Sequence, residues 1–118
     1  KMRFSKDKAT RHTLQYAGSA EDVRRIKELA ERFAARKKIH NRYKLKDVSA
    51  EMVYLNEAKT EASIAFTWQF EDDTKSWSFI KSLYKYLQLR MSGSAEGGFS
   101  PYDNPRSYVP MPILAEPD

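Results

Sequence analysis

The chain has 118 residues, of which 41% are hydrophobic and 31% charged, and its formal net charge is +5. This length fits one domain with a core of its own, and the composition excludes a disordered chain. The sequence has no cysteine and no apolar run of about 18 residues, so we expect no disulfide, no thiolate chemistry, no membrane partner and a cytoplasmic location.

The first predicted elements are a short strand and a long amphipathic helix. Residues 10–18, TRHTLQYAG, alternate between apolar and polar side chains and end at Gly18, which predicts a strand. Residues 19–38 begin at Ser19, a good N-cap, and carry acids in the first turn and cations at the end. Their apolar residues recur at helical spacing and predict a surface helix with one buried face: Val23, Ile26, Leu29, Ala30 and Phe33.

Two half-buried strands are predicted next, joined by a turn at residues 56–61. In the first, Val48, Ala50, Met52 and Tyr54 alternate with mostly polar residues. In the second, the apolar face is Ile64, Phe66, Trp68 and Phe70. An aromatic row of this kind could stack on bases, but a helix needs an apolar face to pack on. We therefore assign the row to the core.

A second helix is predicted at residues 74–91, TKSWSFIKSLYKYLQLRM, with Asp72, Asp73 and Thr74 as candidate caps. Its apolar residues cover more than one stripe of the helix surface. One face should meet the sheet, and either the C-terminal tail or a second copy of the chain should cover the rest.

The composition changes near residue 92, which divides the chain into a domain, 1–91, and a tail, 92–118. All five prolines lie after residue 100. We expect the tail to rest on its own chain, on another subunit of a homodimer or in the groove of another partner. The residues predicted to make this oligomer or partner contact are Phe79, Tyr86, Tyr102, Tyr108, Met111, Ile113 and Leu114.

These elements predict an α+β fold with a β-α-β-β-α core. If the segment SYVPMPIL, residues 107–114, adds a final edge strand, the order becomes that of the ferredoxin-like fold. Prolines at 110 and 112 restrict such a strand to the edge of the sheet.

Charge is distributed unevenly along the chain. Residues 1–46 contain fifteen basic and five acidic residues, a net of +10, whereas residues 47–118 contain six basic and eleven acidic residues, a net of −5. A basic half of this kind indicates a polyanionic partner. The candidate nucleic-acid-binding residues are Arg25, Arg32, Arg36, Lys37, Lys38, His40, Arg42, Tyr43, Lys44 and Lys46, with Tyr43 as a stacking platform for a single strand.

The alternative interpretation is that these cations are the solvated end of a helix. Helix C-termini favour cations, and Glu28 and Glu31 can pair with neighbouring basic residues. No acid, however, lies between Arg32 and Lys46.

The sequence carries little that indicates catalysis. His12 and His40 have no metal-ligand spacing, no glycine-rich phosphate loop is present, and residues 71–73 are acidic but typical of a helix cap. No metal and no cofactor are therefore expected. One enzyme class remains, a metal-free ribonuclease that would use His40, Arg42, Tyr43 and Lys44.

We therefore expect a small accessory protein that binds nucleic acid, or another phosphate-rich ligand, without catalysis. The alternative is a protein-interaction module, a regulator or inhibitor that docks an acidic protein surface through the same cations.

Overall fold

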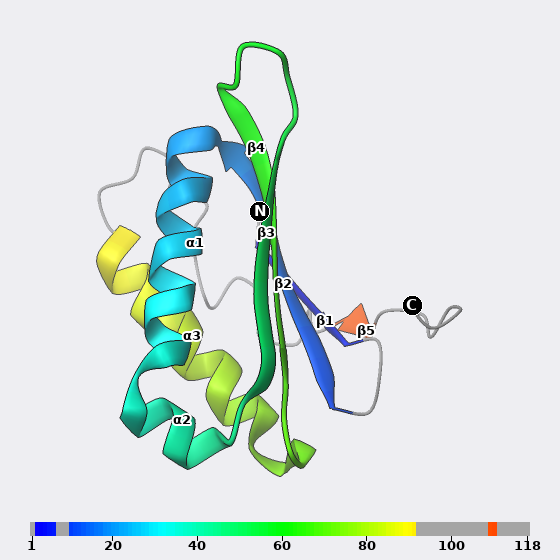
Figure 1. Ribbon diagram of the computed structural model, residues 1–118, viewed down its shortest axis with the longest axis vertical. Coiled ribbons are helices and arrows are strands. Elements are labelled where there is room, and N and C mark those ends of the chain that lie inside the picture. Colours follow the sequence, from blue (N-terminus) through cyan, green and yellow to red (C-terminus); the bar gives the residue numbers. More distant parts are fainter. Residues whose placement is uncertain (1, 7–9, 92–108, 111–118) are drawn as a thin grey trace.

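The computed structural model describes residues 2–6, 10–91 and 109–110. They form one sheet with helices packed on one of its faces (Figure 1). Strands β1 (Arg3–Lys6), β2 (Arg11–Ser19), β3 (Lys46–Tyr54) and β4 (Glu61–Gln69) are antiparallel neighbours in the order β3-β4-β2-β1. The two-residue strand β5 (Val109–Pro110) pairs in parallel with β1 at the edge. The prediction of an α+β fold is confirmed.

The ferredoxin-like order is not confirmed, because an additional N-terminal strand, β1, separates the predicted first strand, β2, from the C-terminal strand β5. This N-terminal strand pairs with β2 in the register Arg3 to Gln15 and lies between β2 and β5. Its four residues, RFSK, are too few to show a convincing period of two. Phe4 nevertheless joins the core, with its ring 4.6 Å from that of Tyr84.

The predicted first helix is two helices in the structure. Helix α1 (Ala20–Ala35) begins as expected, with the Ser19 hydroxyl accepting the Asp22 amide at 3.1 Å, and buries the predicted apolar face. Arg36 is extended, at φ −65° and ψ 131°, and separates α1 from α2 (Lys37–Tyr43). This one residue changes the direction of the chain, so that Ile39 and Tyr43 of α2 also reach the core.

The two strands of the predicted hairpin differ in burial. In β4 the aromatic row is core as predicted: Phe66 and Trp68 are fully buried, and Phe70 follows just after the strand. Strand β3 is less buried than predicted: Ala50 and Met52 pack partly against the core, and the strand lies at the sheet edge, with β4 as its one neighbour among the described strands. Val48 and Tyr54 are both 41% exposed, although we predicted that they face the core.

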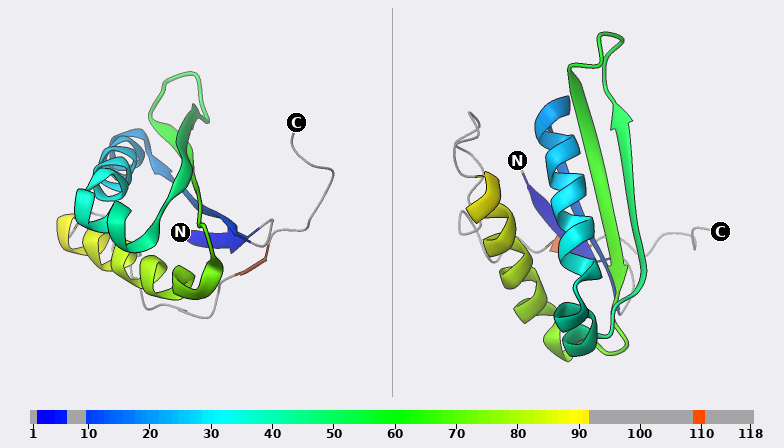
Figure 2. Two further views of the ribbon diagram at one scale, coloured as in Figure 1. Left: turned by 60° about the horizontal axis from the view of Figure 1, so that its bottom comes forward. Right: turned by 60° about the vertical axis from the view of Figure 1, so that its left-hand side comes forward.

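A short 3-10 turn, η1 (Asp73–Lys75), leads into α3 (Ser76–Met91). Asp72 accepts the Thr74 amide at 2.9 Å and the Thr74 hydroxyl, and these bonds lower the pKa of the Asp72 carboxyl. Helix α3 runs beside α1 (Figure 2). Between the two helices, the rings of Phe79 and Tyr86 contact that of Phe33. None of the helices within the described ranges is long and apolar enough to cross a membrane.

Candidate nucleic-acid interface

The short helix α2 holds the centre of the predicted basic surface in a fixed position. Its two buried residues, Ile39 and Tyr43, are four positions apart and therefore lie on one side of the helix. The Tyr43 hydroxyl hydrogen-bonds the Ser78 hydroxyl at 3.0 Å, and its ring meets Phe79 edge-on at 5.2 Å. The remaining side of α2 faces solvent and carries Lys37, Lys38, His40 and Arg42, all of which are exposed.

The C-terminus of α2 is closed by Lys44. Its amide donates to the His40 carbonyl at 2.8 Å, and its backbone lies in the left-handed region at φ 54° and ψ 52°. A residue in this conformation ends a helix by supplying a donor to a carbonyl of the last turn. Lys44 thereby separates the cations of α2 from Lys46, the first residue of β3.

Nine of the ten residues predicted to bind nucleic acid are exposed in the structure. Tyr43 is the exception, being only 4% exposed, which corrects the expectation of a stacking platform at this position. Its ring is enclosed by Phe79 on one side and contacts Arg42, whose guanidinium carbon lies 5.5 Å from the ring centroid. Tyr43 therefore anchors the interface and does not offer a free ring to a ligand.

The exposed cations from Arg32 to Lys46 form no ion pair with any described residue. In the described part of the chain, the expected pairing of acids along α1 is seen between Lys27 and Glu31, whose charged atoms are 3.2 Å apart. No acid within salt-bridge distance meets any of the seven cations from Arg32 to Lys46, again among the described residues. Seven positive charges on one segment raise the local potential and attract a polyanion. We name this set the α2 surface: Arg32, Arg36, Lys37, Lys38, Arg42, Lys44 and Lys46.

The structure adds cations from α3 that were missed in the sequence. Arg90 lies over the Tyr86 ring at 3.8 Å, and Arg36 approaches the same ring at 5.8 Å, so the two arginines flank one tyrosine. Lys81 and Lys85 are also exposed on α3. A signal was available in the sequence, because residues 74–91 contain no acid.

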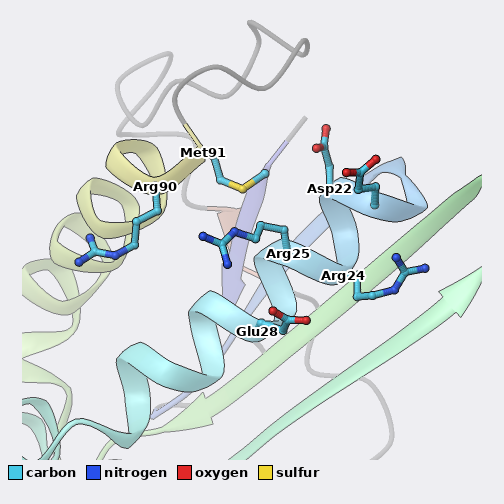
Figure 3. Close-up of a pocket in the computed structure, with 7 residues that line it drawn as sticks. Asp22, Arg24, Arg25, Glu28, Arg90 and Met91 are labelled. Atoms are coloured by element: carbon cyan, nitrogen blue, oxygen red, sulfur yellow. The ribbon is translucent and has the colours of Figure 1, made fainter.

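Arg25 lies apart from the α2 surface in a mixed-charge pocket. Its lining combines three arginines with three acids and one methionine: Glu21, Asp22, Arg24, Arg25, Glu28, Arg90 and Met91. Figure 3 shows Arg25 pointing toward α3 and Arg24 leaving the helix on the other side. The neighbouring Tyr54 hydroxyl raises the pKa of the Arg24 guanidinium. The acids around Arg25 offset its charge, so it contributes less to an anion site than the α2 surface.

Three of the four residues proposed for a metal-free ribonuclease line one pocket, and the fourth, His40, is not part of that lining. Arg42, Tyr43 and Lys44 line an open pocket of about 330 Å³ at the end of α2, together with Lys75, Glu71, Asp72 and Asn41, but His40 is not part of its lining. The Tyr43 hydroxyl is engaged by Ser78. No group of acids and histidines that could hold a metal ion occurs among the described residues.

Two of the seven residues predicted to make an oligomer or partner contact lie within the described ranges. Phe79 is fully buried and Tyr86 is 8% exposed, so both pack inside the chain, contrary to their predicted place on a contact surface. Tyr102, Tyr108, Met111, Ile113 and Leu114 lie outside the described residues. The apolar residues that α3 does expose are Trp77 and Leu89.

Comparisons with known proteins found no relative from which a function could be transferred. No protein-family model, no curated protein and no solved structure matches the chain. Its activity is therefore inferred from the exposed cations and from the residues that hold them in place.

Proposed function

We propose that this protein is a small cytoplasmic accessory factor that binds nucleic acid through the α2 surface and acts by binding, without catalysis. One observation carries this proposal: seven exposed cations, unpaired with any acid of the described chain, lie within fifteen consecutive positions that contain no Asp or Glu.

The physical basis is the release of counterions. A strand of nucleic acid carries condensed cations, and each lysine or arginine that neutralises a phosphate sets one of them free. Ion pairs within the protein would reduce this gain, because a cation already paired must first lose its partner. Among the residues that the structure describes, no acid forms such a pair with the α2 surface.

The docking of α2 supports the same proposal. Long basic side chains lose conformational entropy when they bind, but their backbone is already fixed by Ile39, Tyr43 and the cap at Lys44. A ligand therefore does not have to order the segment that holds it. This arrangement favours binding by a preformed surface.

The test is fluorescence anisotropy with a labelled single-stranded RNA, a single-stranded DNA and a duplex DNA, at about 50 and 200 mM salt. The variant carries Lys37→Gln, Lys38→Gln and Arg42→Gln. We expect its affinity to fall at least about tenfold, and the slope of log affinity against log salt to become shallower by about two, since each phosphate contact contributes about 0.7 on a single strand.

The matched control carries Arg24→Gln, Lys27→Gln and Lys59→Gln. It loses the same charge, but Arg24 interacts with Tyr54, Lys27 pairs with Glu31, and Lys59 lies over the Tyr54 ring. We expect it to bind nearly as tightly as the wild type. Absence of binding to all three probes at low salt would overturn the proposal and leave an acidic protein surface as the partner to seek.

A further inference from the structure

The two tryptophans of this chain have opposite environments. Trp68 is fully buried in β4, stacked on His12 with ring centroids 5.9 Å apart. Trp77, in the first turn of α3, is 43% exposed. Its ring makes no aromatic or cation-π contact within the described residues. An indole that is half in water, and that has no ring partner in the described ranges, can offer its face to a ligand.

Trp77 lies beside the end of α2. Its neighbour Ser78 hydrogen-bonds Tyr43 at 3.0 Å, and Lys75, two positions earlier, donates to the Arg42 carbonyl at 3.5 Å. The residues on both sides of Trp77 thus touch the last turn of α2. Figure 2 shows α2 lying against the start of α3 in both views.

Cations continue from Trp77 along α3. Lys81 and Lys85 follow at intervals of four residues, so they lie on the same face of the helix as Trp77, and both are exposed. Helix α3 has no acidic residue. An exposed indole therefore shares a helix face with two lysines of α3, and its chain neighbours Ser78 and Lys75 contact the end of α2.

A surface of this kind distinguishes single strands from duplexes. Cations hold the phosphates of either form, but an aromatic ring can stack only on a base whose face is exposed. In a duplex that face is covered by neighbouring bases. The buried Tyr43 cannot supply such a stack, whereas Trp77 can.

We propose, resting on the nucleic-acid binding proposed above, that Trp77 stacks on a base and that the ligand is a single strand of RNA or DNA whose backbone continues from the α2 surface onto Lys81 and Lys85. The α2 surface supplies the salt-dependent part of the affinity. Trp77 supplies a part of the affinity that does not depend on salt and that requires a nucleobase to stack on.

The first experiment uses intrinsic fluorescence. An oligonucleotide of fifteen thymidines is titrated into the wild-type protein and into Trp77→Phe, with an abasic strand of equal length and charge as the matched probe. We expect the thymidine strand to quench the wild-type emission and to leave the emission of Trp77→Phe, which comes from buried Trp68, unchanged. The abasic strand should bind with little quenching.

The second experiment compares affinities by anisotropy. Trp77→Ala should bind single strands about tenfold or more weakly, as expected for the loss of one stack, with an unchanged salt slope and unchanged duplex binding. Lys81→Gln with Lys85→Gln should instead make the salt slope shallower by about 1.4. Circular dichroism and the thermal midpoint check that each variant is folded, and the RNA strand in parallel shows which sugar is preferred.

The outcomes separate this inference from the proposed function. If neutralising α2 abolishes binding while Trp77→Ala binds single strands as tightly as the wild type, the stacking role of Trp77 is wrong and nucleic-acid binding stands. Equal affinity for duplex and single strand in the wild type would also overturn it. If no probe binds at low salt, the proposed function itself fails, and an exposed Trp77 is then an anchor for a protein partner.

Discussion

Lys44 ends α2 in a conformation that suits glycine better than lysine. Its φ of 54° places Cβ close to backbone atoms, a cost that glycine does not incur. We expect Lys44→Gly to raise the free energy of unfolding by about 0.5–1 kcal/mol while removing one cation from the α2 surface. Urea denaturation measures the change.

The control for Lys44→Gly is Lys46→Gly, which removes the same charge from the start of β3. There glycine weakens a strand, so this variant should be less stable than the wild type. If both variants lose stability, the backbone at Lys44 is not in the left-handed region in solution. If both variants bind nucleic acid more weakly by a similar factor, the loss of affinity comes from the removed charge and not from the change in stability.

Helix α2 is the element on which the interface depends, and Tyr43 is its main anchor. Seven residues are too few for a helix to be stable alone, so α2 exists because it is docked. We expect Tyr43→Phe to lower the free energy of unfolding by about 1 kcal/mol, since it leaves the ring in place and removes only the hydrogen bond to Ser78.

A double-mutant cycle with Ser78→Ala checks this anchor. Once Tyr43 has lost its hydroxyl, the serine substitution should cost little more, giving a coupling energy of about 0.5–1.5 kcal/mol. Additive effects of the two substitutions would show that the hydroxyls are not bonded to each other. Nucleic-acid affinity should change little in Tyr43→Phe, because no cation is moved.

At the scale of the molecule, and among the described residues, helices α2 and α3 are positively charged and the β3–β4 hairpin is negatively charged, whereas α1 carries four acids and four cations. Helices α2 and α3 carry six lysines and arginines and no acid, whereas residues 46–69 carry Asp47, Glu51, Glu57 and Glu61 against two lysines. The boundary between positive and negative regions in the structure therefore differs from the boundary between the two halves of the sequence. Lys81, Lys85 and Arg90 belong to the acidic half of the chain but lie on α3, which has no acid.

Because of this distribution, we expect nucleic-acid affinity to depend more on the position of a charge than on the net charge. Lys38→Glu in α2 and Lys59→Glu in the hairpin turn each lower the net charge of +5 by two. We expect Lys38→Glu to weaken binding severalfold and to make the salt slope shallower, and Lys59→Glu to have little effect. Anisotropy at several salt concentrations measures both. Equal losses would mean that the field of the whole protein, rather than a defined surface, attracts the ligand.

Sequence alone determined the features that depend on local pattern. The Ser19 cap and apolar stripe of α1, the aromatic core row of β4, and the exposed run of cations after Arg32 follow from spacing and residue type, and the structure agrees. The tertiary structure decided what depends on distant partners. It paired β1 with β2, placed β3 at the edge, and turned the chain at Arg36 so that Tyr43 is buried against Phe79. Burial of a given side chain is set by contacts far apart in the sequence, which is why the exposed aromatic residue beside α2 is Trp77 and not Tyr43.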